Sequence, residues 1–468
     1  MEVINELSET WSYRGEGNSS LVVANIKERK VLRLRKCSTD SNAEKQEANR
    51  RDWVLCKDYI DNVMLPLLGD MFVTSPKLVK LTPEFVRAVN RDCLDIRPKK
   101  RLNAHADSDI LVAMVMPDAC LLSHPVTGNE NPTFCVEIKC KQGFLPPYSL
   151  EKSKPNEPVC RFCMLQQLKV KRGSLNHRSK FCPLDIFSGD PGRMRHTLLN
   201  LLQTPQNNLK IFKNGSLFFS CHEGNPSTLF DLQSLVQQLQ SLDDTENSSP
   251  DLKTVEECLQ SNAVSVMTEV LTKALLHVDS ITDDRTRSTD ICAASSYHQN
   301  SEPHSSGLPS GCVLHSVLTA QYLDTSGVYR IYKDYKTLLD YKESHPKHKE
   351  RLQVDGPYPP KYLAMESQSC NKTEDQPVKV PPDVLEGFQK VRNFLVAGTS
   401  KDLSIMVTFQ KLPSNISSQS KYITVGSLGN QFQHAIKIVD LDPKPSTRIP
   451  KYVKLEDEIW QNYRFGER

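Results

Sequence analysis

The chain has 468 residues, a hydrophobic fraction of 38% and a formal net charge of +3, from 59 basic and 56 acidic residues. This length can bury substantial cores, and we expect two lobes or domains. A charge so near neutral disfavours a nucleic-acid binder, so any anion site must come from a local cluster of cations. The aromatic residues, scattered without a stacking pattern, disfavour nucleic acid too.

Targeting and redox signals indicate a reducing compartment. The sequence has no apolar run of about 18 residues, so no membrane span is expected. The acidic N-terminus lacks an apolar signal core. Fourteen cysteines without a secretion signal indicate reduced thiols, and hence a cytoplasmic or nuclear protein.

Hydrophobic spacing predicts strands and helices in an α+β arrangement. Residues 11–36 indicate strands around a glycine-rich turn, 46–68 a helix that ends at Gly69, and Pro83 the start of another helix. Further along we expect strands at 110–116 and 133–141, helices at 158–171 and 191–203, a hairpin at Asn214-Gly215, and one long helix at 253–278.

The polar segment 279–311 interrupts this pattern and is predicted to be a flexible insertion. Shorter polar loops are expected at about 241–252, 366–378 and 411–420. Beyond the insertion we expect helices near 313–343 and at 382–397, the second ended by Gly398, and then strands at 403–409, 421–426 and 432–439. We divide the chain into an N-terminal lobe (1–120) and a C-terminal lobe (121–468) around a cleft.

The segment Val136–Gly143 (VEIKCKQG) is the most informative in the chain. In a strand, alternate side chains point to opposite faces. Phe134, Val136, Ile138 and Cys140 would face a core, and Glu137, Lys139 and Lys141 would share the other face. Two aligned ammonium groups suit a polyanion, although an ordinary amphipathic strand with one wet face explains this segment equally well.

A glycine-rich turn is the second chemical feature. Gly15-Glu16-Gly17-Asn18-Ser19-Ser20 lies between strand-like residues, and loop amides and hydroxyls can donate to phosphate. Arg33, in the next strand, would be placed to reach phosphate oxygens. The pattern resembles the nucleotide-covering hairpin of protein-kinase-like folds, yet a turn of this kind is more often a plain hairpin.

Two aspartates near strand ends are the third feature. Asp402 precedes the strand LSIMVTF and Asp440 follows the apolar run at 436–439. Phosphoryl transfer needs one carboxylate to orient and deprotonate a hydroxyl and another to hold Mg²⁺. The commoner use of aspartate at a strand end is in a turn. Lys444, Arg448 and Tyr452 follow at intervals of four, but nearby prolines argue against a regular helix.

Three cysteines indicate a structural zinc site. Cys160, Cys163 and Cys182 provide a C-x₂-C pair and a third thiol, and His177 or Cys221 could be the fourth ligand. Zinc would pin the helix that carries Lys169. The alternative is that these are small buried residues on a helix face.

Together these motifs resemble the inositol-pentakisphosphate 2-kinase family over essentially the whole chain outside the loop insertions. The resemblance is carried by YRGEGNSS (13–20), VEIKCKQGFLP (136–146), CPLDIFSG (182–189), PQNNLKIFKNGSL (205–217), KDLSIMV (401–407) and VDLDPKP (439–445). It implies a two-lobed fold distantly related to protein kinases. It also implies an activity, in which MgATP phosphorylates the 2-hydroxyl of inositol 1,3,4,5,6-pentakisphosphate to give inositol hexakisphosphate.

The resemblance also implies residue roles. Asp402 would be the catalytic base, Lys139 would also meet the transferred phosphate, and Asp440 would hold Mg²⁺. The implied ATP ligands are Gly17, Asn18, Ser19, Ser20, Arg33, Pro117, Asp118, Ala119, Glu137, Lys139 and Lys210. Of these, Pro117, Asp118 and Ala119 match the hinge that borders the adenine. The implied inositide ligands are Arg101, Lys141, Lys169, Asn207, Asn208, Lys444, Arg448 and Tyr452.

The sequence departs from the family pattern at two positions. Cys140 stands where members commonly have proline, and Lys210 where plant members have arginine; the lysine spacing and the charge are kept. A non-catalytic inositide-binding scaffold or pseudokinase is the alternative function, disfavoured because a mere receptor needs no base. We expect a monomer whose partners are ATP and inositol pentakisphosphate, with no nucleic acid and no membrane.

Overall fold

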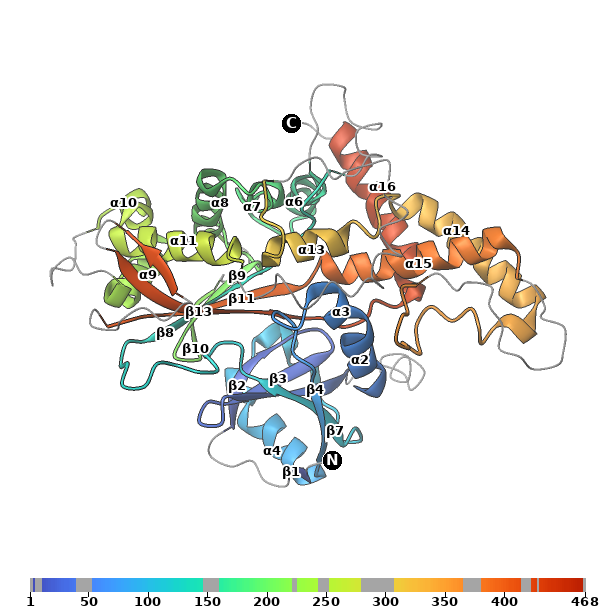
Figure 1. The fold of residues 1–468 in the computed structure, drawn as a ribbon, viewed down its shortest axis with the longest axis horizontal. Coiled ribbons are helices and arrows are strands. Elements are labelled where there is room, and N and C mark those ends of the chain that lie inside the picture. Colours follow the sequence, from blue (N-terminus) through green and yellow to red (C-terminus); the bar gives the residue numbers. More distant parts are fainter. Residues whose placement is uncertain are drawn as a thin grey trace.

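The computed structural model describes residues 3–4, 11–38, 53–145, 160–220, 225–242, 252–278, 307–364, 380–413, 422–426 and 429–465. Within these ranges the chain is a mixed α/β structure with two β-sheets, consistent with the α+β class (Figure 1). The predicted lobe boundary at residue 120 falls after the last strand of the first sheet and before the first strand of the second.

The first sheet contains seven strands from the described N-terminal residues. Their spatial order is β1 (Val3–Ile4), β5 (Lys77–Leu81), β7 (Val112–Pro117), β4 (Lys30–Ser38), β3 (Ser20–Asn25) and β2 (Trp11–Glu16), with β6 (Ala104–Ala106) beside β4. The β1–β5 pair is parallel and the other pairs are antiparallel. Apolar strand residues such as Leu21 and Leu32 pack with Phe85 of α4 (Pro83–Asp92) in one core. The helix begins at Pro83, as the sequence predicts, and the Thr82 side chain caps it by accepting from the Phe85 N–H.

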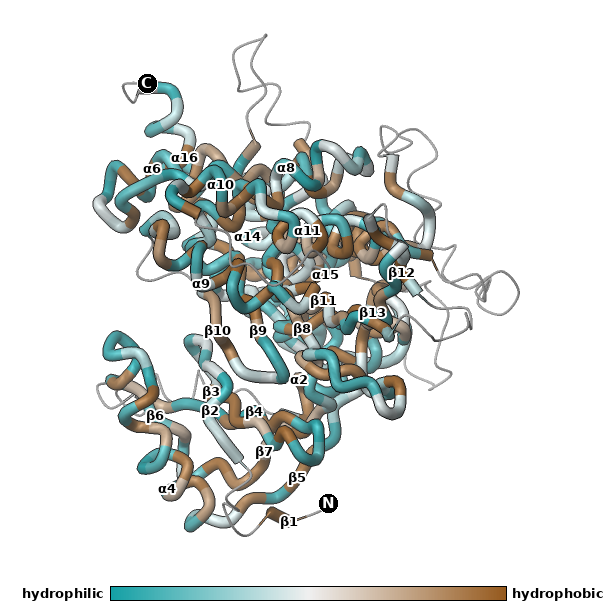
Figure 2. Tube along the Cα trace, turned by 90° about the vertical axis from the view of Figure 1, so that its left-hand side faces the viewer, coloured by the Kyte–Doolittle hydropathy of each residue, from teal (hydrophilic) through white to brown (hydrophobic). Residues whose placement is uncertain are grey.

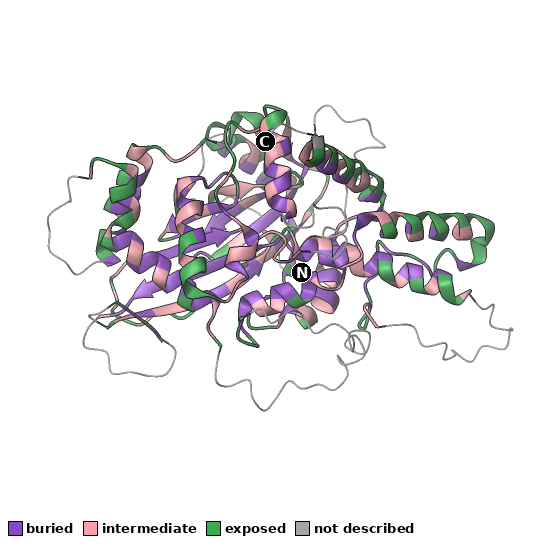
Figure 3. Cartoon of the chain, turned by 90° about the horizontal axis from the view of Figure 1, so that it is seen from above, coloured by how far each residue is buried: buried purple, intermediate pink, exposed green. Residues whose placement is uncertain are grey.

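The second sheet has six described strands, all paired antiparallel. Their order is β10 (Ser216–Ser220), β9 (Leu209–Lys213), β8 (Thr133–Ile138), β11 (Ser404–Lys411), β13 (Asn430–Val439) and β12 (Tyr422–Val425). Every residue of the central strands β8 and β11 is buried (Figure 3). The alternative of an ordinary amphipathic strand with one wet face is therefore wrong, because both faces of β8 are buried. The predicted strand face shared by Glu137, Lys139 and Lys141 is not formed either, because both lysines lie beyond the end of β8.

Helices lie over one face of the second sheet and extend beyond one end of it. They are α6 (Arg161–Lys171), α7 (Pro183–Ile186), α8 (Pro191–Gln203), α9 (Leu229–Leu239), α10 (Val255–Gln260), α11 (Asn262–Leu275), α13 (Val313–Gln321), α14 (Val328–Ser344), α15 (Pro382–Ser400) and α16 (Ile449–Phe465). In Figure 1, α8, α11 and α13 lie above the sheet, and α14 and α15 run side by side to the right. None of the helices that the structure describes is both long and apolar enough to cross a membrane.

One helical segment joins the two sheets. It comprises α2 (Trp53–Tyr59), a π-helical turn (Ile60–Met64) and α3 (Leu65–Leu68), and ends at Gly69 as predicted. The missing N–H of Pro66 favours this irregular turn. The Tyr59 hydroxyl donates to Thr399 of α15 (3.1 Å), and the Phe72 carbonyl accepts from Ile438 of β13 (2.8 Å). Figure 2 shows α2 between the N-terminal strands below and β8, β11 and β13 above.

Four predicted elements differ from the structure. The helix expected at 253–278 is broken at Ser261, whose extended backbone begins α11. Helix α15 runs through Gly398 to Ser400, because the buried residues around Gly398 outweigh its weak helix propensity. Strand β8 ends at Ile138, where its antiparallel neighbours β9 and β11 begin, so pairing stops there. A regular helix does begin at Ile449, since Pro450 lies in its first turn, where proline is tolerated.

The predicted insertion is also shorter at its C-terminal end. Residues 307–311 are described, and Leu308 is buried in the core of the second sheet. Residues 279–306 lie outside the described residues, as do 46–52, 243–251, 366–378 and 414–420 from the predicted helix and loops. The hairpin at Asn214-Gly215 is confirmed, with β9 and β10 on either side.

Candidate functional site

Antiparallel pairing brings most of the predicted charged residues to one edge of the second sheet. Ser404 at the start of β11 pairs with Val439 at the end of β13, so Asp402 and Asp440 lie at the same edge. Ile138, the last residue of β8, pairs with Ile405 and with Leu209, the first residue of β9. The segments just outside the sheet here therefore carry Lys139 and Lys141 after β8, Asn207 and Asn208 before β9, Asp402 before β11 and Asp440 after β13.

A first cluster of charges centres on Glu137 and Asp440. Lys139 donates to Asp440 Oδ2 (2.7 Å) and Lys210 donates to Glu137 Oε2 (2.9 Å). The Ser404 hydroxyl lies 2.9 Å from Glu137 Oε1 and 3.1 Å from Asp440 Oδ2, and its single proton can serve only one of them. Two carboxylates, each paired with an ammonium group, thus lie on either side of one buried hydroxyl.

A second cluster centres on Asp402. Lys141 donates to its Oδ1 (3.0 Å) and Lys444 to its Oδ2 (2.9 Å). Lys169, on α6, is near enough for its charge to interact with those of Lys141 and Asp402. Three lysines from three separate segments therefore surround one carboxylate, which leaves an excess of positive charge.

The lysines set the protonation state of both aspartates. Removal from bulk water would raise the pKa of Asp402, but Lys141 and Lys444 outweigh this and hold that pKa well below its usual range. In Asp440, Lys139 overcomes the same desolvation and lowers the pKa to about 2. Desolvation lowers the pKa of Lys141, with a smaller opposing effect from Asp402. Both aspartates are therefore ionised at neutral pH, and Lys141 is a cation that is costly to keep desolvated.

Arg33 connects the first sheet to this edge of the second. Its guanidinium donates to Asp442 Oδ2 (3.0 Å) and to the Ser20 hydroxyl (3.3 Å). Asp442 lies two residues after Asp440, which has a left-handed backbone (φ 65°). Arg33 is thus placed beside the predicted metal ligand, and part of its donor capacity is used by Asp442.

The glycine-rich turn is a tight hairpin end with its own ion-pair network. Gly17 N–H donates to the Ser20 carbonyl (2.9 Å), and the Ser19 carbonyl accepts from the backbone of Lys36 (3.1 Å). Arg101 donates to the Asn18 side chain, which places it beside the turn. Below the turn, the buried carboxylate of Glu16 pairs with Lys36 and Arg97, a network that the sequence did not reveal.

The predicted hinge follows β7 directly. Pro117 ends that strand, and the buried Asp118 forms an ion pair with Arg14 of β2. The Ala119 carbonyl accepts from the hydroxyl of Thr408 on β11 (2.5 Å). These contacts tie the hinge to both sheets.

The remaining predicted inositide ligands differ in exposure. Asn207 is exposed, whereas Asn208 is 2% exposed. The backbone carbonyl of Asn208 accepts from the backbone N–H of Lys139 (2.9 Å). Asn208 therefore fixes the backbone that carries Lys139. Arg448 is exposed at the end of a 3₁₀ turn before α16, and the ring of Tyr452 lies 6.3 Å from that of Phe394.

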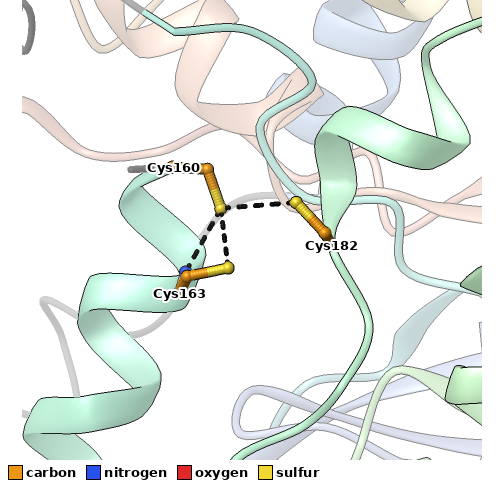
Figure 4. A group of neighbouring side chains, drawn as sticks. All are labelled: Cys160, Cys163 and Cys182. Atoms are coloured by element: carbon orange, nitrogen blue, oxygen red, sulfur yellow. Dashed lines mark hydrogen bonds between the residues drawn. The ribbon is translucent and has the colours of Figure 1, made fainter. Parts of the chain in front are cut away.

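Three cysteine thiols meet at the starts of α6 and α7 (Figure 4). Cys160 Sγ lies 3.0 Å from Cys163 Sγ and 3.8 Å from Cys182 Sγ, and the three sulfur atoms are all within 4.8 Å of one another. His177 is exposed and is not part of this group, and Cys221 lies outside the described residues. The predicted trio is therefore brought together, but without the predicted histidine.

Sequence reasoning missed several residues of this region. Ser404 and Asp442 lie inside the KDLSIMV and VDLDPKP motifs, so their closeness to Asp402 and Asp440 was the available signal. Gln321, which hydrogen-bonds the backbone of Lys141, gave no signal because it lies far away in the sequence.

Comparisons with known proteins agree with the motifs. A family model described as inositol-pentakisphosphate 2-kinase matches residues 13–458. An inositol-pentakisphosphate 2-kinase of Danio rerio is 34% identical over 99% of this chain and 95% of its own length. One of Arabidopsis thaliana is 26% identical over 99% of this chain and 95% of its own length. Because the match spans nearly the whole chain, this protein is a kinase and belongs to the inositol-pentakisphosphate 2-kinase family.

Proposed function

We propose that this chain transfers the γ-phosphoryl group of ATP to the 2-hydroxyl of inositol 1,3,4,5,6-pentakisphosphate, giving inositol hexakisphosphate. The family membership supports the substrate class. The observation that carries the proposal is the Asp402 carboxylate, held between Lys141 and Lys444 at the sheet edge where Asp440 also lies. The scaffold alternative is set aside because the relatives are named as kinases.

The charge around Asp402 suits a polyphosphorylated substrate. An inositol pentakisphosphate carries on the order of eight or more negative charges, since each phosphomonoester contributes up to about two. Lysine ammonium groups and a guanidinium suit such dense phosphate arrays. We assign the inositide to Lys141, Lys169, Lys444 and Arg448, with Arg101, Asn207, Asn208 and Tyr452 as further ligands.

In this proposal Asp402 acts as the general base. Its low pKa keeps the carboxylate ionised, so it can accept a hydrogen bond from the attacking hydroxyl and then its proton. Substrate phosphates would compete for Lys141 and Lys444, which frees Asp402 oxygens for that hydroxyl. A phosphoryl transfer of this kind depends on orientation and charge stabilisation more than on a strong base.

We assign ATP to the glycine-rich turn, the hinge and the Glu137 cluster. Gly17, Asn18, Ser19 and Ser20 would cover the phosphates with Arg33, Lys139 and Lys210, and Pro117, Asp118 and Ala119 would border the adenine. Asp440, Glu137 and Ser404 form an oxygen donor set of the type that Mg²⁺ prefers. The Asp440 side chain is 48% exposed to solvent, so an ion can reach it. Bound Mg²⁺ would neutralise charge on the ATP phosphates.

We also propose a structural zinc ion at Cys160, Cys163 and Cys182. The spacing of the sulfur atoms fits thiolate ligands, and interactions with the thiols of Cys160 and Cys163 lower the pKa of Cys182, favouring its thiolate. Zinc would fasten the start of α6, which carries Lys169, to the start of α7. The two lobes, their distant relation to protein kinases, a monomeric state and a cytoplasmic or nuclear location stay predictions.

The decisive experiment is an isomer-resolved assay. The protein is incubated with MgATP and a panel of inositol phosphates, and the products are separated by isomer. We expect inositol hexakisphosphate from the 1,3,4,5,6-pentakisphosphate, and its formation about 10²- to 10⁴-fold more slowly with Asp402→Asn. Asp383→Asn is the matched control, because Asp383 is an exposed aspartate at the other end of α15. Binding of the pentakisphosphate without its phosphorylation would refute the proposal.

A further inference from the structure

The amide side chain of Gln321 contacts the two segments that carry Lys141 and Asp402. Gln321 is the last residue of α13 and is 0% exposed. Its Nε2 donates to the carbonyls of Lys141 (2.8 Å) and Ser400 (3.2 Å), and its Oε1 accepts from Gly143 N–H (2.8 Å). Both amide protons are used, so one side chain bridges the loop after β8 and the turn before β11.

The loop that Gln321 holds has an unfavourable backbone conformation. Lys141 has φ 60°, which costs a residue with a side chain more than it costs glycine. Gln321 hydrogen-bonds the carbonyl of Lys141 and the N–H of Gly143, two residues later, so its side chain bridges the two ends of the turn. The ring of Phe187 packs so near Gly143 that an added Cβ would lie 2.3 Å from it. The strained position of Lys141 is therefore fixed from two directions.

The residues next to Gln321 repeat this bridge. Tyr322 stacks on Phe144 of the same loop, with ring centroids 4.5 Å apart. Asp324 pairs with Lys401 (3.4 Å), the neighbour of Asp402. The C-terminal end of α13 thus contacts both the lysine loop and the aspartate turn at several points.

We infer that Gln321 is a positioning residue for phosphoryl transfer, which sets the placement of the Lys141 ammonium relative to the Asp402 carboxylate. This rests on the proposed function, since it gives Lys141 and Asp402 their roles. Gln321 itself touches backbone groups on both segments and acts only through them. Displacement of a reacting group by about 1 Å can cost on the order of 100-fold in rate.

The test is a double-mutant cycle between Gln321→Met and Lys141→Met, read by kcat and KM for both substrates. We expect Gln321→Met to lower kcat about 10- to 100-fold. KM for ATP should stay unchanged, because the backbone of Lys139, the assigned ATP ligand in the same loop, is held by the Asn208 carbonyl and not by Gln321. If Gln321 acts through Lys141, the double variant loses little more than Lys141→Met alone. The dissociation constant for inositol pentakisphosphate, measured over the same cycle, should show the same lack of additivity.

Gln410→Met is the matched control. Gln410 is also buried (4% exposed) and donates to two backbone carbonyls, of Asn131 (2.6 Å) and Asn129 (3.5 Å), but near the other end of β11. We expect it to keep wild-type kcat. If Gln321→Met does not fold, Gln321→Glu takes its place, since it keeps the shape and the acceptor for Gly143 but loses the amide donor.

Three results would overturn the inference. They are wild-type kcat in the folded Gln321 variants, effects of Gln321→Met and Lys141→Met that multiply fully, and an equal loss of kcat in Gln410→Met. Failure of the proposed function gives a different result, because the wild-type protein would then form no inositol hexakisphosphate. The cycle on the dissociation constant still decides the role of Gln321 in that case.

Discussion

Replacement of Asp402 by asparagine should lower kcat without weakening substrate binding. The variant keeps the size of the side chain but loses the proton acceptor, and loss of a general base typically costs about 10²- to 10⁴-fold in rate. The Asp402 carboxylate also forms ion pairs with the Nζ atoms of Lys141 (3.0 Å) and Lys444 (2.9 Å). Without its charge, both ammonium groups are more available to substrate phosphates.

The size of the binding effect follows from exposure. The Asp402 side chain is 52% exposed, so each ion pair is screened by solvent and contributes about 0.2–1 kcal/mol. Two such pairs give roughly 0.4–2 kcal/mol, which corresponds to about 2- to 30-fold tighter binding of inositol pentakisphosphate. The variant should therefore combine a large loss of kcat with a lower dissociation constant.

The measurement combines single-turnover rates with calorimetric titration of inositol pentakisphosphate, and Asp383→Asn serves as the control. Near-wild-type kcat in folded Asp402→Asn would refute the role as base. A large loss of affinity would refute the competition between Asp402 and the substrate for the two lysines.

Further predictions concern the metal sites, the joint between the sheets and substrate recognition. Asp440→Ala should abolish turnover, and raised Mg²⁺ should restore part of it; a rate independent of Mg²⁺ in the wild type would contradict the assignment. Arg33→Met should destabilise the fold by about 3–5 kcal/mol, because it removes the hydrogen-bonded ion-pair partner of the largely buried carboxylate of Asp442; chemical denaturation measures this, and a loss below about 1 kcal/mol would contradict the pairing. The purified protein should contain close to one zinc ion by elemental analysis and Cys160→Ser should lose it, whereas an equal zinc content in both would exclude the site. Arg448→Ala should weaken binding of the pentakisphosphate but not of an analogue that lacks the contacted phosphate, and equal losses for every analogue would show that Arg448 is not a ligand.

The sequence by itself determined much of the local structure and the chemistry of this protein. The spacing of apolar residues predicted β8, β11 and β13, and Gly69, Pro83 and the Asn214-Gly215 pair marked two helix ends and a hairpin correctly. These features depend on neighbouring residues, so a sequence reveals them. The six motifs also identified the family, which the comparisons support independently.

Only the tertiary structure decided which charges meet. Sheet pairing places Asp402 and Asp440 at one edge although they are 38 positions apart in the sequence. A side-chain ion pair joins Arg33 of the first sheet to Asp442, beyond the end of β13. Packing around Gly398 overrides its helix propensity, and both faces of β8 are covered where its alternation suggested one wet face. The bridge made by Gln321 had no local signal at all, because its three partners are backbone groups. A sequence pattern records what a side chain can do, but long-range pairing decides which partner it has.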